Sequence, residues 1–247
     1  MSHHVIEARD VWFTYPGGAE ALRGVSFRIT HGEAVALIGC NGAGKSTLLL
    51  HLNGYLSPTR GEIRIGDCLL TRQTVALARR VVGLVFQDPD DQLFMPTVFE
   101  DVAFGPLNQG LSDAEVEMRV AAALERVGMT HLRDRPPHKL SAGEKRAVAI
   151  ATVVAMAPDV LVMDEPSSNL DPRSRRRLIG LLQGFEHTRI LATHDLELVV
   201  EVCPRVLVMD GGAIVREGPT AEVLDDEPFM VAHGLERPHI LRHMHPH

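Results

Sequence analysis

The sequence predicts an α/β fold with a mostly parallel central sheet, an antiparallel β layer before it and a helical subdomain inserted into it. Two observations predict the sheet. Short continuous apolar runs, which are typical of strands buried on both faces, recur at residues 34–38, 81–86, 160–163, 189–192 and 206–209. Helical patterns lie between these runs, and strands that alternate with helices along a chain form parallel sheets.

The antiparallel layer is expected at the start of the chain. Residues 5–15 and 23–30 have the composition of short strands, and the proline and glycines at 16–18 form a turn between them. The first buried run then ends at a glycine-rich loop. A helix is expected directly after that loop, over about residues 45–53.

The helical subdomain is expected at about residues 95–157, where the pattern is helical rather than strand-like. One helix is sharply marked, because Ser112 and Glu115 form a capping box at its start and Gly128 ends it. Its apolar residues fall on one face, at Val116, Val120, Ala123, Leu124 and Val127.

Composition excludes several classes of protein. Hydrophobic residues make up 45% and charged residues 23%, which is ordinary for a soluble globular protein. The formal net charge of −7 leaves no basic excess to neutralise phosphates, so we expect no nucleic-acid partner and no anionic membrane surface. The longest near-continuous apolar run, 147–157, is well short of the roughly 20 residues that span a bilayer.

The first residues and the cysteines indicate a cytosolic protein. The chain starts without a basic region followed by an apolar stretch, so we expect no secretory signal. Cys40, Cys68 and Cys203 fit neither a paired disulfide set nor the CxxC spacing of a metal site. A reducing compartment is the simplest interpretation.

A phosphate-binding loop is predicted at residues 39–46, which fit GxxxxGK[ST] between a buried strand and a helix. Its glycines let backbone N–H groups converge on phosphate oxygens, Lys45 reaches the β and γ phosphates, and Ser46 ligates magnesium. The alternative is a glycine-rich turn without a ligand. The predicted nucleotide-binding residues of this loop are Gly39, Asn41, Gly42, Ala43, Gly44, Lys45, Ser46 and Thr47.

Two carboxylates, Asp164 and Glu165, follow the buried run 160–163, at the sheet edge where open α/β sheets bind ligands. We expect Asp164 to hold a magnesium ion and Glu165 to orient or deprotonate the attacking water. The alternative is an acidic pair that only caps the next turn.

The pentapeptide LSAGE at 140–144 lies between the phosphate loop and the acidic pair. Together with Tyr15, Gln87, the segment 168–171 and His194, this order of motifs resembles the ATP-binding cassette (ABC) superfamily over about residues 5–225. Small GTPases and P-loop kinases share the phosphate loop but lack such a pentapeptide. The resemblance implies the ABC-ATPase form of the P-loop NTPase fold, with ATP and Mg²⁺ as its ligands.

The resemblance also implies roles for single residues. Tyr15 stacks on adenine, and Gln87 contacts magnesium or water and relays the state of the nucleotide to a partner. His194 contacts the γ-phosphate and positions the attacking water. The implied catalytic residues are Glu165, His194, Lys45 and Gln87, and the implied metal ligands are Ser46, Gln87 and Asp164.

Signature residues of this family act on the nucleotide of a second subunit. By the resemblance, Ser141 and Gly143 face ATP bound by a partner, and Asp171 lies in the loop that communicates between the subunits. The complete catalytic set implies a homodimer with two ATP molecules between its halves. Ala142 and Glu144 depart from the usual LSGGQ, so the affinity of the signature site and its rate stay open.

The segments 86–94, 96–98 and 100–106 resemble the ATPase of energy-coupling-factor importers, and they favour the cobalt and nickel branch over the vitamin branch. The implied partners are a transmembrane coupling protein and a metal-binding integral membrane subunit, at the cytoplasmic face of the membrane. Other readings are a solvated acidic loop, a soluble cassette protein that acts on chromosomes or ribosomes, and a non-hydrolysing regulatory cassette. An acidic loop read alone is most often solvated. Soluble cassette proteins usually carry a long coiled coil or two tandem cassettes, and this chain has neither. The complete catalytic set argues against the regulatory cassette.

The chain is expected to form one nucleotide-binding domain at 1–228, followed by a histidine-rich tail at 229–247. Its histidines are His233, His239, His243, His245 and His247. A metal site is one hypothesis, but prolines flank the group and no carboxylate or cysteine cluster completes it. We favour a disordered tail and expect that removing the residues after Leu224 leaves nucleotide binding intact.

Overall fold

A computed structural model describes residues 4–242 of the chain. Its central sheet has six strands in the order β10-β9-β3-β8-β7-β6. The strands are β3 (Ala34–Ile38), β6 (Val82–Val85), β7 (Val160–Asp164), β8 (Thr188–Ala192), β9 (Arg205–Asp210) and β10 (Ala213–Pro219). All neighbours pair in parallel except β10 and β9, so the predicted mostly parallel sheet is confirmed.

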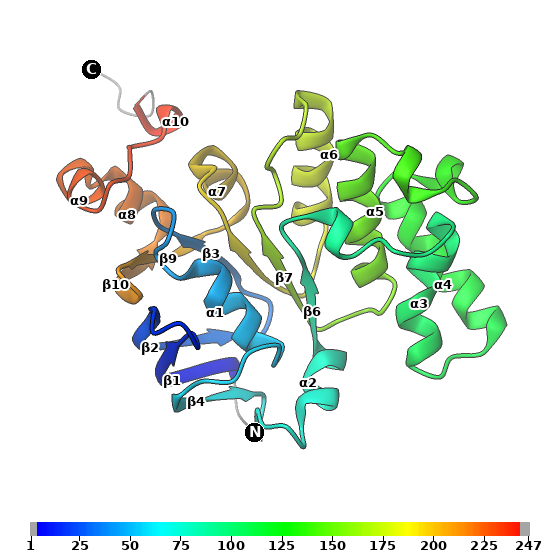
Figure 1. Ribbon diagram of the computed structural model, residues 1–247. Coiled ribbons are helices and arrows are strands. Elements are labelled where there is room, and N and C mark those ends of the chain that lie inside the picture. Colours follow the sequence, from blue (N-terminus) through cyan, green and yellow to red (C-terminus); the bar gives the residue numbers. More distant parts are fainter. Residues whose placement is uncertain (1–3, 243–247) are drawn as a thin grey trace.

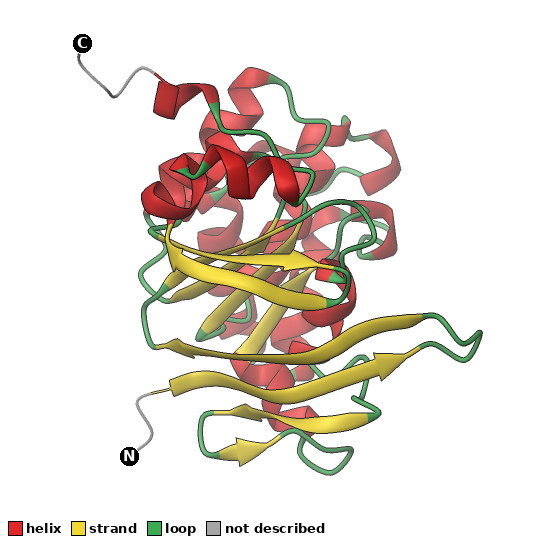
Figure 2. Ribbon diagram, turned by 90° about the vertical axis from the view of Figure 1, so that its left-hand side faces the viewer, coloured by secondary structure: helices red, strands yellow, loops and turns green. Residues whose placement is uncertain are grey.

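A second, four-stranded sheet forms the predicted antiparallel layer, in the order β2-β1-β4-β5. Its strands are β1 (His4–Thr14), β2 (Glu20–Thr30), β4 (Arg60–Ile65) and β5 (Cys68–Leu69). Figure 2 shows this sheet at one side of the molecule, with most of the helices at the other.

Helices cover both faces of the central sheet and extend beyond its β6 edge (Figure 1). The first seven are α1 (Lys45–Leu52), α2 (Val75–Val81), α3 (Val98–Asn108), α4 (Asp113–Arg126), α5 (Ala142–Val154), α6 (Pro172–Gln183) and α7 (Leu196–Val202). Within residues 4–242, none of the helices has both the length and the apolar character that crossing a bilayer requires.

Alternation along the buried strands creates two cores, one on each face of the central sheet. In β3, Ala36 and Ile38 join the core that contacts α3, α5, α6 and α7, whereas Val35 and Leu37 join the core under the antiparallel sheet and α1. Both faces are covered, which explains why these strands appear in the sequence as continuous apolar runs.

The middle of the chain contains the expected helices α3, α4 and α5. Ser112 caps α4, with the capping box to Glu115 that the sequence predicts, and the predicted apolar face is buried. A second capping box starts α5, where Ser141 is the N-cap and Glu144 reaches back to it. Gln92 and Arg146 join this helical region to the end of β6, as described below.

The C-terminal segment differs from the expected disordered tail. It forms α8 (Thr220–Asp225), α9 (Glu227–Ala232) and α10 (His239–Arg242), so the boundary expected at residue 228 falls inside a helix. Met230 is fully buried and Leu235 is 8% exposed, because both pack into the larger core. Within the described part of the chain, no group of three or more His, Cys, Asp or Glu side chains is placed to hold a metal. His243, His245 and His247 lie outside the described residues.

Candidate active site

The predicted phosphate loop connects the end of β3 to the start of α1. A Cβ atom at Gly39 would come within 2.2 Å of the Met209 carbonyl oxygen, and one at Gly44 within 2.6 Å of the Ala21 carbonyl oxygen. Glycine is therefore required at both positions. The Lys45 side chain is buried, and its ammonium donates to the carbonyls of Gly39 and Cys40 at 2.7 and 3.1 Å.

Asp164 lies at the end of β7, beside the phosphate loop. The side chain of Ser46 hydrogen-bonds to it, and Lys45 lies close enough to act on its charge. Burial raises the pKa of the Asp164 carboxyl, and the bond from Ser46 opposes that rise only in part. Its Oδ1 atom is buried and has no hydrogen-bond partner.

These groups fit a magnesium ion. Mg²⁺ prefers hard oxygen ligands and is commonly held by one or two carboxylates together with substrate phosphates. A buried carboxylate oxygen without a partner, next to a hydroxyl, supplies such ligands at the edge of a phosphate loop. The predicted metal residues Ser46 and Asp164 thus lie together, and Gln87 lies in the loop that follows the neighbouring strand β6.

Glu165 and His194 come from the ends of adjacent strands β7 and β8. The Glu165 Oε2 atom lies 2.8 Å from His194 Nδ1, and it accepts from the Thr193 hydroxyl at 3.1 Å and from the His194 backbone N–H at 3.3 Å. Glu165 is 7% exposed, and its backbone has a φ of 45°, so a strained turn holds the carboxylate inward. The side chain of His194 is 67% exposed.

A cavity of about 530 Å³ joins these groups. It is lined by the phosphate-loop residues Gly39 and Asn41 together with Gln87, Glu165 and His194. Five residues that the sequence analysis selected separately therefore face one space. A carboxylate held by two donors beside a phosphate-binding loop can act as a general base for water.

Tyr15 lies beside the first turn of α1, and the residue is 38% exposed. Its hydroxyl lies 3.0 Å from the Thr47 hydroxyl, and its ring packs edge-on against Phe13 with centroids 4.9 Å apart. The buried His51 ring supports Phe13 from behind, at 4.6 Å. The predicted adenine platform is thus fixed to the helix that starts at the phosphate loop.

Ser141, Gly143 and Asp171 form a separate group. Ser141 and Asp171 cap the N-termini of α5 and α6, and a Cβ at Gly143 would come within 2.8 Å of the Ser174 hydroxyl. Across residues 4–242, none of the three lines the 530 Å³ cavity. Figure 1 shows α5 and α1 on opposite sides of β6 and β7. Leu140 and Ala142 line a cavity with Gln87 and Asp164, but none of the phosphate-loop residues 39–46 lines that cavity.

Residues 22–168 match the family model for ABC transporters, which spans more than half of the chain. The chain belongs to the ABC transporter family. A putative ABC transporter ATP-binding protein of Geobacter sulfurreducens is 60% identical over 238 residues, which cover 96% of each chain. The energy-coupling factor transporter ATP-binding protein EcfA of Methanocaldococcus jannaschii is 46% identical over 242 residues, covering 96% of this chain and 87% of EcfA.

Two solved structures are similar to this ABC protein over nearly its full length. One is cbiO1 from Clostridium perfringens, part of the ABC transporter complex cbiONQ, with a TM-score of 0.82, 38% identity and 98% and 99% of the two chains covered. The other is a dimeric ATP-binding cassette, MJ0796, bound to ADP and phosphate, with a TM-score of 0.79, 27% identity and 87% and 98% covered. The predicted fold and the ABC-type ATPase activity are confirmed.

Sequence reasoning missed the residues that fix the loop after β6 in this ABC ATPase. The buried Arg146 guanidinium donates to the carbonyls of Phe86 and Gln87 at 3.0 and 2.6 Å. Gln92 accepts from the Phe86 N–H at 3.1 Å and donates to the Ala149 carbonyl of α5 at 2.7 Å. The loop that carries Gln87 is therefore attached to the helix that carries the pentapeptide. Arg146 is the second residue after the pentapeptide, but its sequence position gives no sign of this contact.

Proposed function

We propose that this chain is the ATP-hydrolysing subunit of an energy-coupling-factor importer for cobalt or nickel, and that it acts as a head-to-tail homodimer. The observation that carries the dimer is the separation of the signature from the phosphate loop. Ser141 and Ala142 are exposed at the start of α5. The cavity of 530 Å³ is instead lined by Gly39, Asn41, Gln87, Glu165 and His194. A second copy supplies Ser141 and Gly143 to that cavity, and Asp171 lies beside them.

In this proposal the residues of one copy bind and orient ATP. The N–H groups of the phosphate loop and Lys45 hold the β and γ phosphates, and Tyr15 supports the adenine ring. Glu165 accepts a proton from the attacking water, because His194 and Thr193 hold its carboxylate in place. His194, which is exposed, also reaches toward the γ-phosphate.

Magnesium is expected to be held by Ser46, Asp164 and Gln87 together with phosphate oxygens. When bound, the ion would supply positive charge that offsets the negative charge on the phosphates. The buried, unpartnered Oδ1 of Asp164 supports this assignment.

The dimer is tested by replacing two serines that have the same local role. Ser141 caps α5 through Glu144, and Ser112 caps α4 through Glu115, with hydroxyl to carboxylate distances of 2.8 and 2.6 Å. Each alanine variant should lose about 0.5–2 kcal/mol of folding stability. Only Ser141→Ala should also lose ATP-driven dimerisation, measured by light scattering in the slowly hydrolysing Glu165→Gln background. Equal dimerisation of the two variants would rule out the sandwich.

A partner surface is supported by exposed aromatic residues after β6. Phe94 and Phe104 are 64% and 42% exposed, and their rings pack edge-on with centroids 5.1 Å apart. Leu107, at 52% exposure, extends the apolar surface along α3. Exposed apolar clusters of this kind mark protein interaction sites. We assign this surface to a helix of a transmembrane coupling protein, which would hold the chain at the cytoplasmic face of the membrane.

Partner identity is tested by purification of the chain with its integral membrane proteins. The tagged chain should co-purify a coupling protein, and the double variant Phe94→Ser, Phe104→Ser should not. Met118→Ser serves as the control, because Met118 is 63% exposed on α4, outside this surface. A metal-binding integral subunit among the partners supports cobalt or nickel. A vitamin-binding subunit would assign the chain to the vitamin branch, and a ribosomal or chromosomal partner would overturn the transport function.

A further inference from the structure

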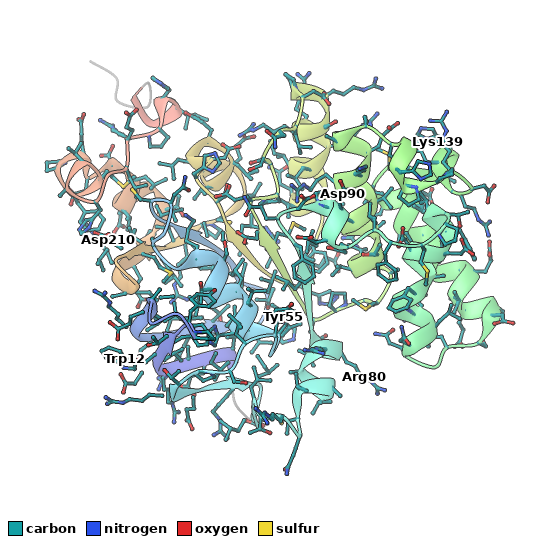
Figure 3. All side chains as sticks on the ribbon, viewed as in Figure 1. Trp12, Tyr55, Arg80, Asp90, Lys139 and Asp210 are labelled. Carbon is teal, nitrogen blue, oxygen red and sulfur yellow. The ribbon has the colours of Figure 1, made fainter. Side chains whose placement is uncertain are left out.

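Residues 233–240, here named the C-terminal strap, follow α9 and reach the proposed nucleotide site. Two buried residues fix the start of the strap in the larger core: Met230 in α9, just before the strap, and Leu235 within it. The first strap residue, His233, packs on Phe229, and its Nδ1 lies 2.8 Å from Asp210 Oδ2 at the end of β9. Figure 3 shows Asp210 on the side of the molecule that carries the C-terminal helices.

The strap contacts the phosphate loop at Cys40. The Cys40 thiol lies 3.3 Å from the His233 carbonyl oxygen and 3.2 Å from the Gly234 carbonyl oxygen, to which it donates. Gly234 has a φ of +68°, and a Cβ atom there would lie 2.7 Å from the Cys40 sulfur. The contact therefore requires both a donor in the phosphate loop and a glycine in the strap.

The strap also forms a wall of the catalytic cavity. Gly234, Leu235 and Glu236 line the 530 Å³ cavity together with Glu165 and His194. At its far end, the Ile240 N–H donates to Glu197 Oε1 at 3.3 Å. Glu197 belongs to α7, which begins just after His194. The strap thus bridges the phosphate loop and the element that positions His194.

We propose that the strap positions the phosphate loop for nucleotide binding, with Cys40 and Gly234 as the positioning residues of this contact. The inference rests on the proposed assignment of the cavity to the triphosphate of ATP. It reverses the expectation that the residues after Leu224 can be removed without effect on nucleotide binding. Ordering a loop before the ligand arrives removes part of the entropy cost of binding, so a loop held by the strap binds more tightly.

The contact is tested with four full-length variants: Cys40→Ala, Cys40→Ser, Gly234→Ala and the double variant Cys40→Ala, Gly234→Ala. Cys68→Ala is the matched thiol control, because Cys68 lies on β5 of the antiparallel sheet. Each protein is measured for its ATP dissociation constant, its kcat and KM for hydrolysis, and its melting temperature. Folding of Cys40→Ala is expected, because Cys40 is exposed.

Losing one hydrogen bond should weaken ATP binding of Cys40→Ala about twofold to tenfold. The effect should be a rise in KM with kcat unchanged, because the contact serves substrate and transition state equally. Cys40→Ser keeps a donor and should bind within about twofold of the wild type. Gly234→Ala should bind at least as weakly as Cys40→Ala. In the double variant the Cys40 sulfur is absent, so a Cβ atom at position 234 no longer meets it. Gly234→Ala should therefore weaken ATP binding less in the Cys40→Ala background than in the wild type.

Two failures are distinguishable. If the wild-type chain does not bind ATP, the proposed nucleotide site is wrong. If the wild type binds ATP and Cys40→Ala binds it equally well, the strap does not position the loop. Additive effects in the double variant, or equal losses in Cys40→Ser and Cys40→Ala, would also overturn the inference. A drop in melting temperature with KM unchanged would show a purely structural contact and overturn it as well.

Discussion

Replacing Asp164 by asparagine should make the protein more stable without nucleotide and unresponsive to magnesium and ATP. Asp164 is 7% exposed, its Oδ1 has no partner, and burial raises the pKa of its carboxyl. The ionised side chain is therefore held in an environment that disfavours its charge. Asparagine has nearly the same shape and no charge, so it removes this cost while leaving the packing unchanged.

The size of the gain follows from the loss of the buried charge. Asparagine keeps a polar atom at this position, so only the extra cost of burying a charged rather than a neutral group is removed, and we expect a gain of about 1–3 kcal/mol. For a chain of this length each kcal/mol moves the melting temperature by about 2–4 °C, which gives a rise of about 2–12 °C.

The gain should depend on pH. The pKa of Asp164 is higher in the folded than in the unfolded chain, so this group favours folding below its unfolded pKa. That contribution is lost as the pH rises through the folded pKa. Asparagine does not titrate. Its advantage should therefore be largest at neutral pH and shrink as the pH falls toward the unfolded pKa of Asp164.

Thermal unfolding at neutral and acidic pH, with and without Mg²⁺ and ATP, measures these effects. At 100 times its dissociation constant, ATP should stabilise the wild type by about 2.7 kcal/mol and leave Asp164→Asn unchanged. Asp101→Asn is the matched control. Asp101 is also buried with a raised pKa, but it accepts the N–H groups of Phe94 and Met95, outside the site. A lower melting temperature for Asp164→Asn at neutral pH, or retained nucleotide stabilisation, would refute the reasoning.

Three further substitutions test single steps. Glu165→Gln should keep ATP binding and lower the rate of phosphate release about 10²-fold to 10⁴-fold. A wild-type rate would remove Glu165 from the role of general base. Glu186→Gln is the control, because Glu186 is exposed. Arg146→Met leaves the Phe86 and Gln87 carbonyls without their donor and should cost about 2–4 kcal/mol in chemical denaturation. An unchanged unfolding midpoint would contradict that contact. Glu144→Gln should shift ATP-driven dimerisation to about twofold to tenfold lower ATP, since a neutral acceptor holds the Ser141 hydroxyl less strongly. If dimerisation needs the same ATP concentration as in the wild type, the bond from Ser141 to Glu144 does not compete with dimer formation.

The elements that the sequence predicted are those whose pattern is decided by burial. The runs 34–38 and 160–163 are covered on both faces, so their residues are apolar throughout. The missed elements are short and half-exposed. β10 alternates between exposed and intermediate positions, and α2 buries only Ala78. Their conformation depends on pairing with β9 or packing beside β6, and neither contact leaves a strong local signal.

The site follows the same division. Asp164 and Glu165 were predictable because they end a buried strand, and parallel strands bring such ends to one edge. Contacts between residues far apart in the sequence were not predictable. Cys40 and Gly234 meet across 194 positions, and neither residue carries a pattern that would pair them. The same holds for Arg146 and the carbonyl of Gln87, since a backbone acceptor has no sequence signature.

The departure of LSAGE from LSGGQ gains a physical meaning from the capping box. The Ser141 hydroxyl and N–H both donate to Glu144 Oε2 at 2.8 Å, and these bonds lower the pKa of the Glu144 carboxyl. Ser112 and Glu115 form the same arrangement on α4, so the box by itself serves to start a helix. In the proposed dimer, Ser141 must release this carboxylate before its hydroxyl can donate to a phosphate. Glu144 then also stands as a negative charge near that phosphate. Both effects favour the separate chains over the ATP-bound dimer. Other contacts in the dimer interface must therefore supply the free energy that closes the dimer around ATP.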